Sequence, residues 1–136
     1  MIMATTFHLQ IVTPDKPVFD GQAEKIILRT ITGDACILAK HIDYAAPLGI
    51  GEARLTDENG NTRIAACNGG LVSVADGEVR VIATTFEWED EIDLERAKRS
   101  QAETEEKIRH LNPQDANYAM MEAKLKRALL RIKISE

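Results

Sequence analysis

The stretch "NGGLVSVADGEVRVIAT", residues 68–84, decides the fold of the first part of this 136-residue chain. Apolar residues crowd both sides of Asp76-Gly77, a dipeptide that favours a tight turn between two strands. Asn59-Gly60 separates "EARLT" from "TRIAAC" in the same way. The "NGG" at residues 68–70 indicates a further tight turn into the next strand. We therefore expect consecutive antiparallel hairpins here.

The residues before this stretch extend the β pattern toward the N-terminus. "TFHLQIVT" (6–13) alternates apolar and polar side chains with period two, and "TPDKP" (13–17) is typical of a turn. "AEKIILRTIT" (23–32) and "ACILA" (35–39) read as strands, whereas "HIDYAAPLGIG" (41–51) reads as irregular. Short strands separated by frequent turns predict a β-sandwich over residues 1–89.

After Glu89 the pattern changes to that of helices. No glycine follows Leu94, and small or apolar residues recur every three or four positions up to Leu111 and again from Tyr118. "LNPQD" interrupts the pattern at Pro113, and Asp115 is a candidate cap for a second helix. Two helices joined by about three residues must fold back on each other. The predicted fold is α+β, an antiparallel β-sandwich (1–89) followed by an antiparallel two-helix hairpin (90–136).

Charge and composition exclude several classes of function. Residues 1–89 hold 12 acidic and 7 basic side chains, and residues 90–136 hold 10 of each. A net charge of −5 argues against nonspecific nucleic-acid binding. Cys36 and Cys67 have no metal-ligand spacing and are expected to be small buried side chains. No stretch approaches the ~20 apolar residues of a membrane span, so we expect a cytosolic or peripheral protein.

No catalytic motif is visible, and we expect neither an enzyme nor a metal site. The three histidines, His8, His41 and His110, are far apart in the sequence. His41 follows an apolar run and precedes a loop with Pro47 and two glycines. It is expected either to organise that loop by hydrogen bonding or to contact a partner.

The segment "EIDLERA" (91–97) begins the first helix, and it contains one residue that a helix start does not explain. Asp93 suits the N-cap, and Ile92 with Ala97 has the spacing of a hydrophobic staple. Arg96 opposes the helix dipole in the first turn. In an antiparallel hairpin, Arg127 and Arg131 approach it from the second helix.

Two explanations of this arginine cluster remain open from the residues alone. Arginine suits bidentate phosphate contacts, so the cluster can bind a phosphate-bearing ligand. It can instead pair with nearby carboxylates. The candidates are Glu87, Glu89, Asp90, Glu91 and Glu95.

The order of these parts resembles the epsilon subunits of bacterial F-type ATP synthases. The resemblance is carried by "FHLQIVTPDKPVFDG", "AEKIILRTITGDACILAKHIDYAAPLGIG", "NGGLVSVADGEVRVIA" and "EIDLERAKRSQAETEEKI". It implies a non-catalytic central-stalk subunit that couples rotation to the c-ring of a proton- or sodium-translocating enzyme at the cytoplasmic face of the cell membrane. Its expected partners are the gamma subunit, the c-ring loops and, with the hairpin extended, the alpha and beta subunits. The alternative is an adaptor module whose hairpin recognises another helical partner.

The resemblance also implies particular residues. The family's ATP motif maps onto Ile92, Asp93, Arg96 and Ala97. It is joined by Glu87 and by Arg127 and Arg131, so ATP is an expected regulatory ligand, although no cofactor is required. Asp34, Lys40 and His41 fall where the family contacts its partners. Two departures stand out: Ala39-Lys40 replaces a Pro-Gly pair, and Glu103 replaces an arginine that some ATP-binding members provide.

Overall fold

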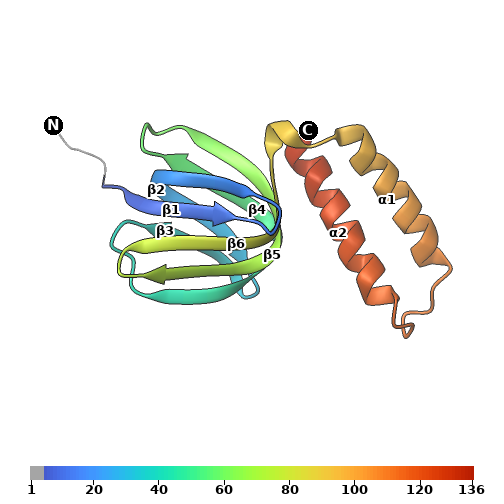
Figure 1. Ribbon diagram of the computed structural model, residues 1–136. Coiled ribbons are helices and arrows are strands. Elements are labelled where there is room, and N and C mark those ends of the chain that lie inside the picture. Colours follow the sequence, from blue (N-terminus) through green and yellow to red (C-terminus); the bar gives the residue numbers. More distant parts are fainter. Residues whose placement is uncertain (1–4) are drawn as a thin grey trace.

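The computed structural model describes residues 5–136, which form a flattened β-sandwich followed by two antiparallel helices (Figure 1). This confirms the predicted fold class. The strands are β1 (Phe7–Val12), β2 (Pro17–Thr30), β3 (Gly33–Leu38), β4 (Tyr44–Asp57), β5 (Thr62–Ala75) and β6 (Glu78–Trp88). A single 3-10 turn (Glu89–Glu91) leads to α1 (Leu94–Arg109) and α2 (Tyr118–Ser135).

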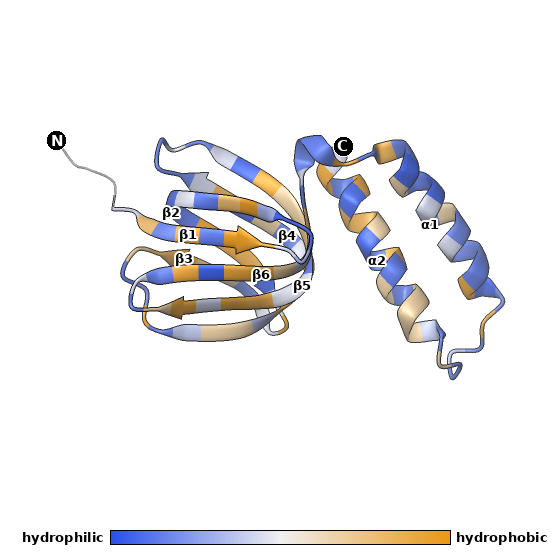
Figure 2. Ribbon diagram, viewed as in Figure 1, coloured by the Kyte–Doolittle hydropathy of each residue, from blue (hydrophilic) through white to orange (hydrophobic). Residues whose placement is uncertain are grey.

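The sheet closes because β1 pairs with a strand on each side. The strand order is β1-β6-β5-β4-β2-β3, with an additional pairing of β1 with β2. The β1–β2 pair is antiparallel, whereas β1 runs parallel to β6, so one pair departs from the antiparallel expectation. Alternating side chains of every strand fill the interior, as the alternation of hydropathy along the strands shows (Figure 2). Phe7, Leu9 and Ile11 of β1 are all buried, as predicted.

The "NGG" segment does not form the predicted turn but lies inside β5. Ala65 and Cys67 face the core before it, whereas Val72 and Val74 face the core after it, so the alternation shifts by one residue at the glycines. Gly69 and Gly70 have φ of 76° and 125°, a backbone conformation that favours glycine. A Cβ on Gly70 would overlap the carbonyl oxygen of Ile82. The glycines therefore bend one continuous strand at a close backbone approach.

Two further expectations for the sandwich are wrong. "HIDYAAPLGIG" is mostly part of β4, because pairing with neighbouring strands holds it extended. Pro47 has no N–H to donate, and it is tolerated because the β2–β4 register shifts here. Its carbonyl accepts from Ile31 N–H (3.2 Å). Cys36 is exposed on β3 and only Cys67 is buried. The Asp57–Gly60 and Asp76–Gly77 turns occur as predicted.

The connection between the helices is longer than the predicted three residues. The first helix ends at Arg109 and the second begins at Tyr118. The Asp115 side chain accepts from Asn117 N–H (2.9 Å) in a turn of its own and does not cap α2, whose N-cap is Asn117. Asn112 makes the same kind of contact with Gln114 N–H (3.0 Å). These side-chain contacts stabilise the turns that connect the two helices.

The helices meet along a seam of small and polar side chains. Ala97 and Thr104 of α1 and Ala128 of α2 are buried. The Thr104 hydroxyl has no hydrogen-bond partner within the described chain, which weakens the closed arrangement. The second helix packs on β4 and β5, whereas α1 lies on its outer side (Figure 1). Neither helix is both long and apolar enough to span a membrane.

The glycine bend makes a prediction about stability. Gly70→Ala places a Cβ 2.0 Å from Ile82 O, so we expect the free energy of unfolding to fall by about 2–4 kcal/mol. Gly60→Ala is the matched control, because Gly60 also has positive φ (82°) but its Cβ would meet open space. We expect it to cost about 1 kcal/mol. Urea unfolding measures the free energy of unfolding of both variants. Equal decreases for the two variants would show that the close approach at Gly70 does not restrict the residue at that position.

Candidate functional site

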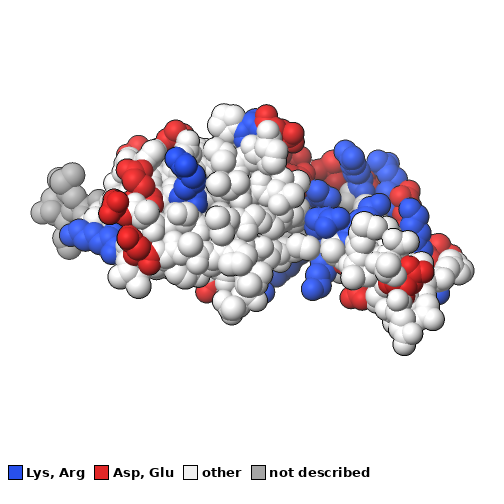
Figure 3. Space-filling model, turned by 60° about the horizontal axis from the view of Figure 1, so that its bottom comes forward, with Lys and Arg blue, Asp and Glu red and all other residues white. Residues whose placement is uncertain are grey.

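A cavity of about 560 Å³ opens where β6 ends and the two helices come together. Its walls come from the end of β6, the 3-10 turn, the first three turns of α1 and the middle of α2. The lining residues are Glu87, Glu91, Asp93, Arg96, Ala97, Arg99, Ser100, Glu103, Lys124 and Arg131. Charged side chains of both signs gather over this part of the molecule (Figure 3).

The start of α1 positions one wall of the cavity. The Asp93 carboxylate accepts a hydrogen bond from Arg96 N–H at 3.1 Å, so it caps the helix as predicted. Arg96, Arg99 and Ser100 follow at helical spacing and line the same cavity. Ala97 is buried, and its small side chain lets α2 approach closely.

The end of β6 and the middle of α2 form the opposite wall. Arg131 Nε donates to Glu87 Oε1 at 2.6 Å, and each side chain is about 30% exposed. Within residues 5–136 this is the one ion pair that joins α2 to the sandwich. Lys16 and Glu91, 3.7 Å apart, link the β1–β2 turn to the 3-10 turn. For Arg131 the structure shows the carboxylate explanation of the arginine cluster, because Arg131 pairs with Glu87 at the edge of the cavity.

The lining has balanced charge and no metal-binding cluster. Arg96, Arg99, Lys124 and Arg131 face four carboxylates, those of Glu87, Glu91, Asp93 and Glu103. The described residues contain no group of three or more side chains suited to hold a metal ion. Such a cavity suits a polar ligand with anionic and hydrogen-bonding groups, because arginine side chains bind such groups well.

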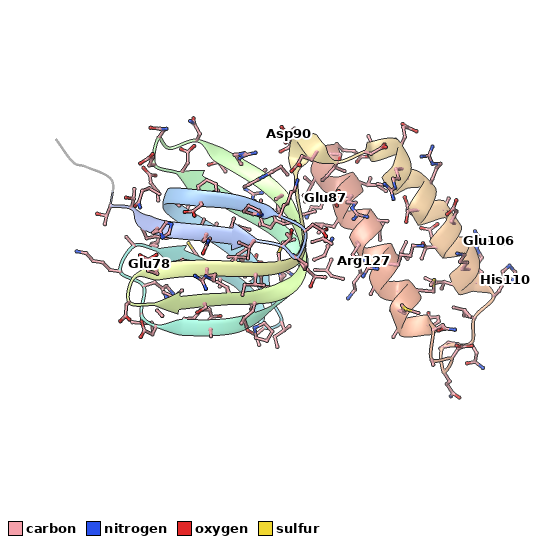
Figure 4. All side chains as sticks on the ribbon, in the orientation of Figure 1. Glu78, Glu87, Asp90, Glu106, His110 and Arg127 are labelled. Atoms are coloured by element: carbon pink, nitrogen blue, oxygen red, sulfur yellow. The ribbon has the colours of Figure 1, made fainter. Side chains whose placement is uncertain are left out.

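The structure brings together most of the predicted nucleotide residues. Glu87, Asp93, Arg96, Ala97 and Arg131 line the cavity. Ile92 and Arg127 do not line it: Ile92 ends the 3-10 turn, and Arg127 lies one helical turn before Arg131. Figure 4 shows Arg127 on the side of α2 toward the sandwich.

Sequence reasoning missed Arg99 and Ser100 as cavity residues. The signal that could have identified them is their spacing of three and four residues from Arg96, which places them on the same face of the helix.

The three predicted partner residues do not form one cluster. Asp34 pairs with Arg29 (2.6 Å) and lines a separate cavity with Leu130 and Lys133 of α2. Lys40 and His41 lie beyond the other end of β3, in the loop before β4. His41 Nδ1 is 2.7 Å from the carbonyl oxygen of Ile42, which agrees with a role in organising the loop.

Lys40 has φ of 62°, so the loop takes a left-handed conformation at a position without glycine.

Comparison with known proteins finds matches over both parts of the chain. A family model described as "ATP synthase, Delta/Epsilon chain, beta-sandwich domain" matches residues 6–89, and the corresponding long α-helix domain matches residues 90–136. The ATP synthase epsilon chain of Bacillus pumilus is 38% identical over 130 residues, covering 96% of this chain and 97% of the relative.

The ATP synthase epsilon chain of Caldanaerobacter subterraneus is 35% identical over 133 residues, covering 98% and 96%. A chain in the Euglena gracilis mitochondrial ATP synthase (OSCP/F1/c-ring) has the same fold, with a TM-score of 0.82. It is 21% identical, and the match covers 98% of this chain and 82% of that one.

The single ion pair between α2 and the sandwich predicts how the hairpin opens. Glu87→Gln removes the charged hydrogen bond, which contributes about 1 kcal/mol at this exposure. We expect amides of α1 and α2 to exchange about fivefold faster while amides of the sandwich are unchanged. Glu106→Gln is the control, because Glu106 pairs with Arg109 and His110 at the far end of α1 (Figure 4). Equal protection of helices and strands in the wild type would contradict a separately opening hairpin.

Proposed function

The chain belongs to the delta/epsilon chain family of ATP synthases, and from that premise we propose that it is a non-catalytic subunit of the central stalk in an F-type enzyme. The observation that carries the proposal is the cavity between a β-sandwich and a loosely attached helical hairpin. In this proposal the sandwich docks on the stalk, and the hairpin moves and restrains ATP hydrolysis. The complex would place the chain peripherally, at the cytoplasmic face of the cell membrane.

An apolar row across the outer face of the sandwich supports docking on the gamma subunit. Val12 pairs with Ile82, Ile82 with Leu71, and Leu71 with Pro47, so one row crosses four strands. Ile82 and Leu71 are 47% and 43% exposed, which places the row outward. Much of the sandwich surface in Figure 3 carries no charged side chains. Exposed apolar surface of this kind is typical of a protein interface.

The loops of the sandwich supply a second candidate contact, with the c-ring. Lys40 and His41 lie beside Ile42, which is 78% exposed. Asp34 follows the β2–β3 turn, where Ile31 is 67% exposed. An exposed isoleucine beside charged or polar side chains can contact polar loops of a partner through both kinds of interaction. We propose Asp34, Lys40 and His41 as partner contacts on two separate loops.

The packing of the hairpin supports its mobility. Its seam buries alanine and threonine, so each contact removes little apolar area at about 25 cal/mol per Å². The buried hydroxyl of Thr104 regains hydrogen bonds when the helices separate. Met120 and Leu129 of α2 are exposed and remain free for another surface, which we propose to be the alpha and beta subunits.

The cavity supports ATP as the ligand that holds the hairpin closed. Its volume, about 560 Å³, lies in the range of small-molecule sites. Arg96 and Arg131 come from α1 and α2, so a polyphosphate between them would join the helices. Glu103 lines the same cavity and opposes phosphate binding. We propose a site formed by Glu87, Asp93, Arg96, Ala97 and Arg131 in the cavity, with Ile92 and Arg127 just outside its lining and with affinity reduced by Glu103.

Docking on gamma can be tested at the apolar row. Leu71→Asp and Ile82→Asp place a charge in the proposed interface, and we expect each to reduce capture by purified gamma subunit at least about tenfold. Ile31→Asp is the control, because Ile31 is even more exposed (67%) but lies outside the row. Wild-type protein that does not bind gamma under native conditions would rule out the proposal.

Nucleotide binding can be tested by calorimetric titration with ATP. We expect the titration to show heat of binding. The Arg96→Ala variant should bind ATP with about tenfold lower affinity, because a phosphate contact is lost. Glu103→Gln should tighten binding by removing a like charge. Lys98→Ala is the control, since Lys98 follows Arg96 on α1 but does not line the cavity. No heat at millimolar ATP, or equal effects of Arg96→Ala and Lys98→Ala, would retire the site.

A further inference from the structure

The strand that closes the sandwich carries a histidine between two carboxylates. His8 lies near the start of β1, with Nε2 2.5 Å from Asp20 Oδ1 on β2 and Nδ1 2.5 Å from Glu78 Oε2 on β6. One side chain therefore spans three strands, and it does so at the strand whose two pairings complete the sheet. Figure 4 shows Glu78 at the end of the sandwich away from the hairpin.

The geometry has a chemical consequence for the protonation of His8. A neutral imidazole has one N–H and one acceptor nitrogen, so it can donate to only one carboxylate. With both carboxylates ionised, both contacts are hydrogen bonds only when both ring nitrogens carry a proton. We propose that protonated His8 is a pH-dependent clasp that holds β1 to β2 and β6.

The surroundings of the clasp support this arrangement. Beside the Asp20 and Glu78 carboxylates, the nearest charged group on β6 is Arg80, which donates to Gln10 Oε1 at 3.1 Å. The adjoining strand β5 contributes only Ser73 and Ala75 to the cavity that His8 lines. Hydrogen bonds to Asp20 and then to Glu78 raise the pKa of His8 above its ordinary value of 6.5, although the side chain is partly exposed.

The sign of the pH dependence follows from this raised pKa. A group whose pKa is higher in the folded protein stabilises the fold fully below the unfolded value of 6.5. The stabilisation is lost as the pH rises through the folded pKa of His8. Loss of one hydrogen bond removes one side-chain link between β1 and a neighbouring strand, whereas the backbone pairing remains. Val12 of the outward apolar row lies further along the same strand.

The test combines nitrogen NMR of the histidine ring with unfolding of the full chain. At pH 6 we expect both ring nitrogens of His8 to be protonated, and the titration midpoint of His8 to shift to lower pH in the Asp20→Asn, Glu78→Gln double variant. In urea unfolding, wild type should exceed His8→Gln in stability below pH 6.5, and this advantage should disappear as the pH rises through the folded pKa. His110→Gln is the matched control and should keep the wild-type pH dependence.

Two results would overturn the clasp. The first is a His8 ring that stays neutral at pH 6 or titrates at the same pH in the double variant. The second is a stability difference between wild type and His8→Gln that is the same at every pH, because packing alone does not depend on protonation. Amide exchange shows which strand responds to the pH. We expect the protection factors of β1 amides to fall with rising pH more than those of β4 amides.

Discussion

The helical hairpin is held against the sandwich by the packing of α2 on β4 and β5 and by one ion pair, between Glu87 of β6 and Arg131 of α2. The sandwich has a continuous apolar core, and every buried residue of that core comes from the strands. The helices bury few side chains, those of Ala97, Thr104, Ala128 and Ile134, and the Thr104 hydroxyl has no hydrogen-bond partner within residues 5–136. A partly exposed ion pair contributes little free energy. We therefore infer that the two parts differ in stability, and that the hairpin can leave the sandwich at low cost.

Because the hairpin is held less firmly than the sandwich, a ligand in the cavity between them can affect the position of the hairpin. The cavity is lined by the sandwich at Glu87 and by both helices at Arg96 and Arg131, so a ligand within it would contact all three elements. A ligand that binds only the closed form shifts the hairpin toward that form in proportion to its affinity. The balanced charge of the lining, with Glu103 among the carboxylates, predicts a modest affinity. The cap at Asp93 belongs to the same cavity, so the start of the helix and the proposed ligand site are one structure.

The sequence was informative wherever a local rule determines the structure. Asp76-Gly77 specifies a turn, Asp93 specifies a helix start, and the spacing of the stripes places Arg96 and Arg131 on facing helices. Prediction from the sequence failed where contacts between distant chain segments determine the structure. Gly69 and Gly70 resemble a turn, but pairing on both sides of β5 makes them a bend within a strand. The His8 clasp depends on Asp20 and on Glu78, which is 70 residues away, and no pattern in the sequence brings those three together.

The central claim, a hairpin that a ligand closes against a fixed sandwich, can be measured as a distance. Spin labels on Cys36 of β3 and on an introduced cysteine, Gln114→Cys, report on the sandwich and on the far end of the hairpin. Cys67 does not interfere, because burial raises the pKa of its thiol to about 12. Pulsed electron resonance should give one narrow distance population with ATP and a broader distribution that includes longer distances without it. A single narrow distribution that ATP does not change would contradict the account.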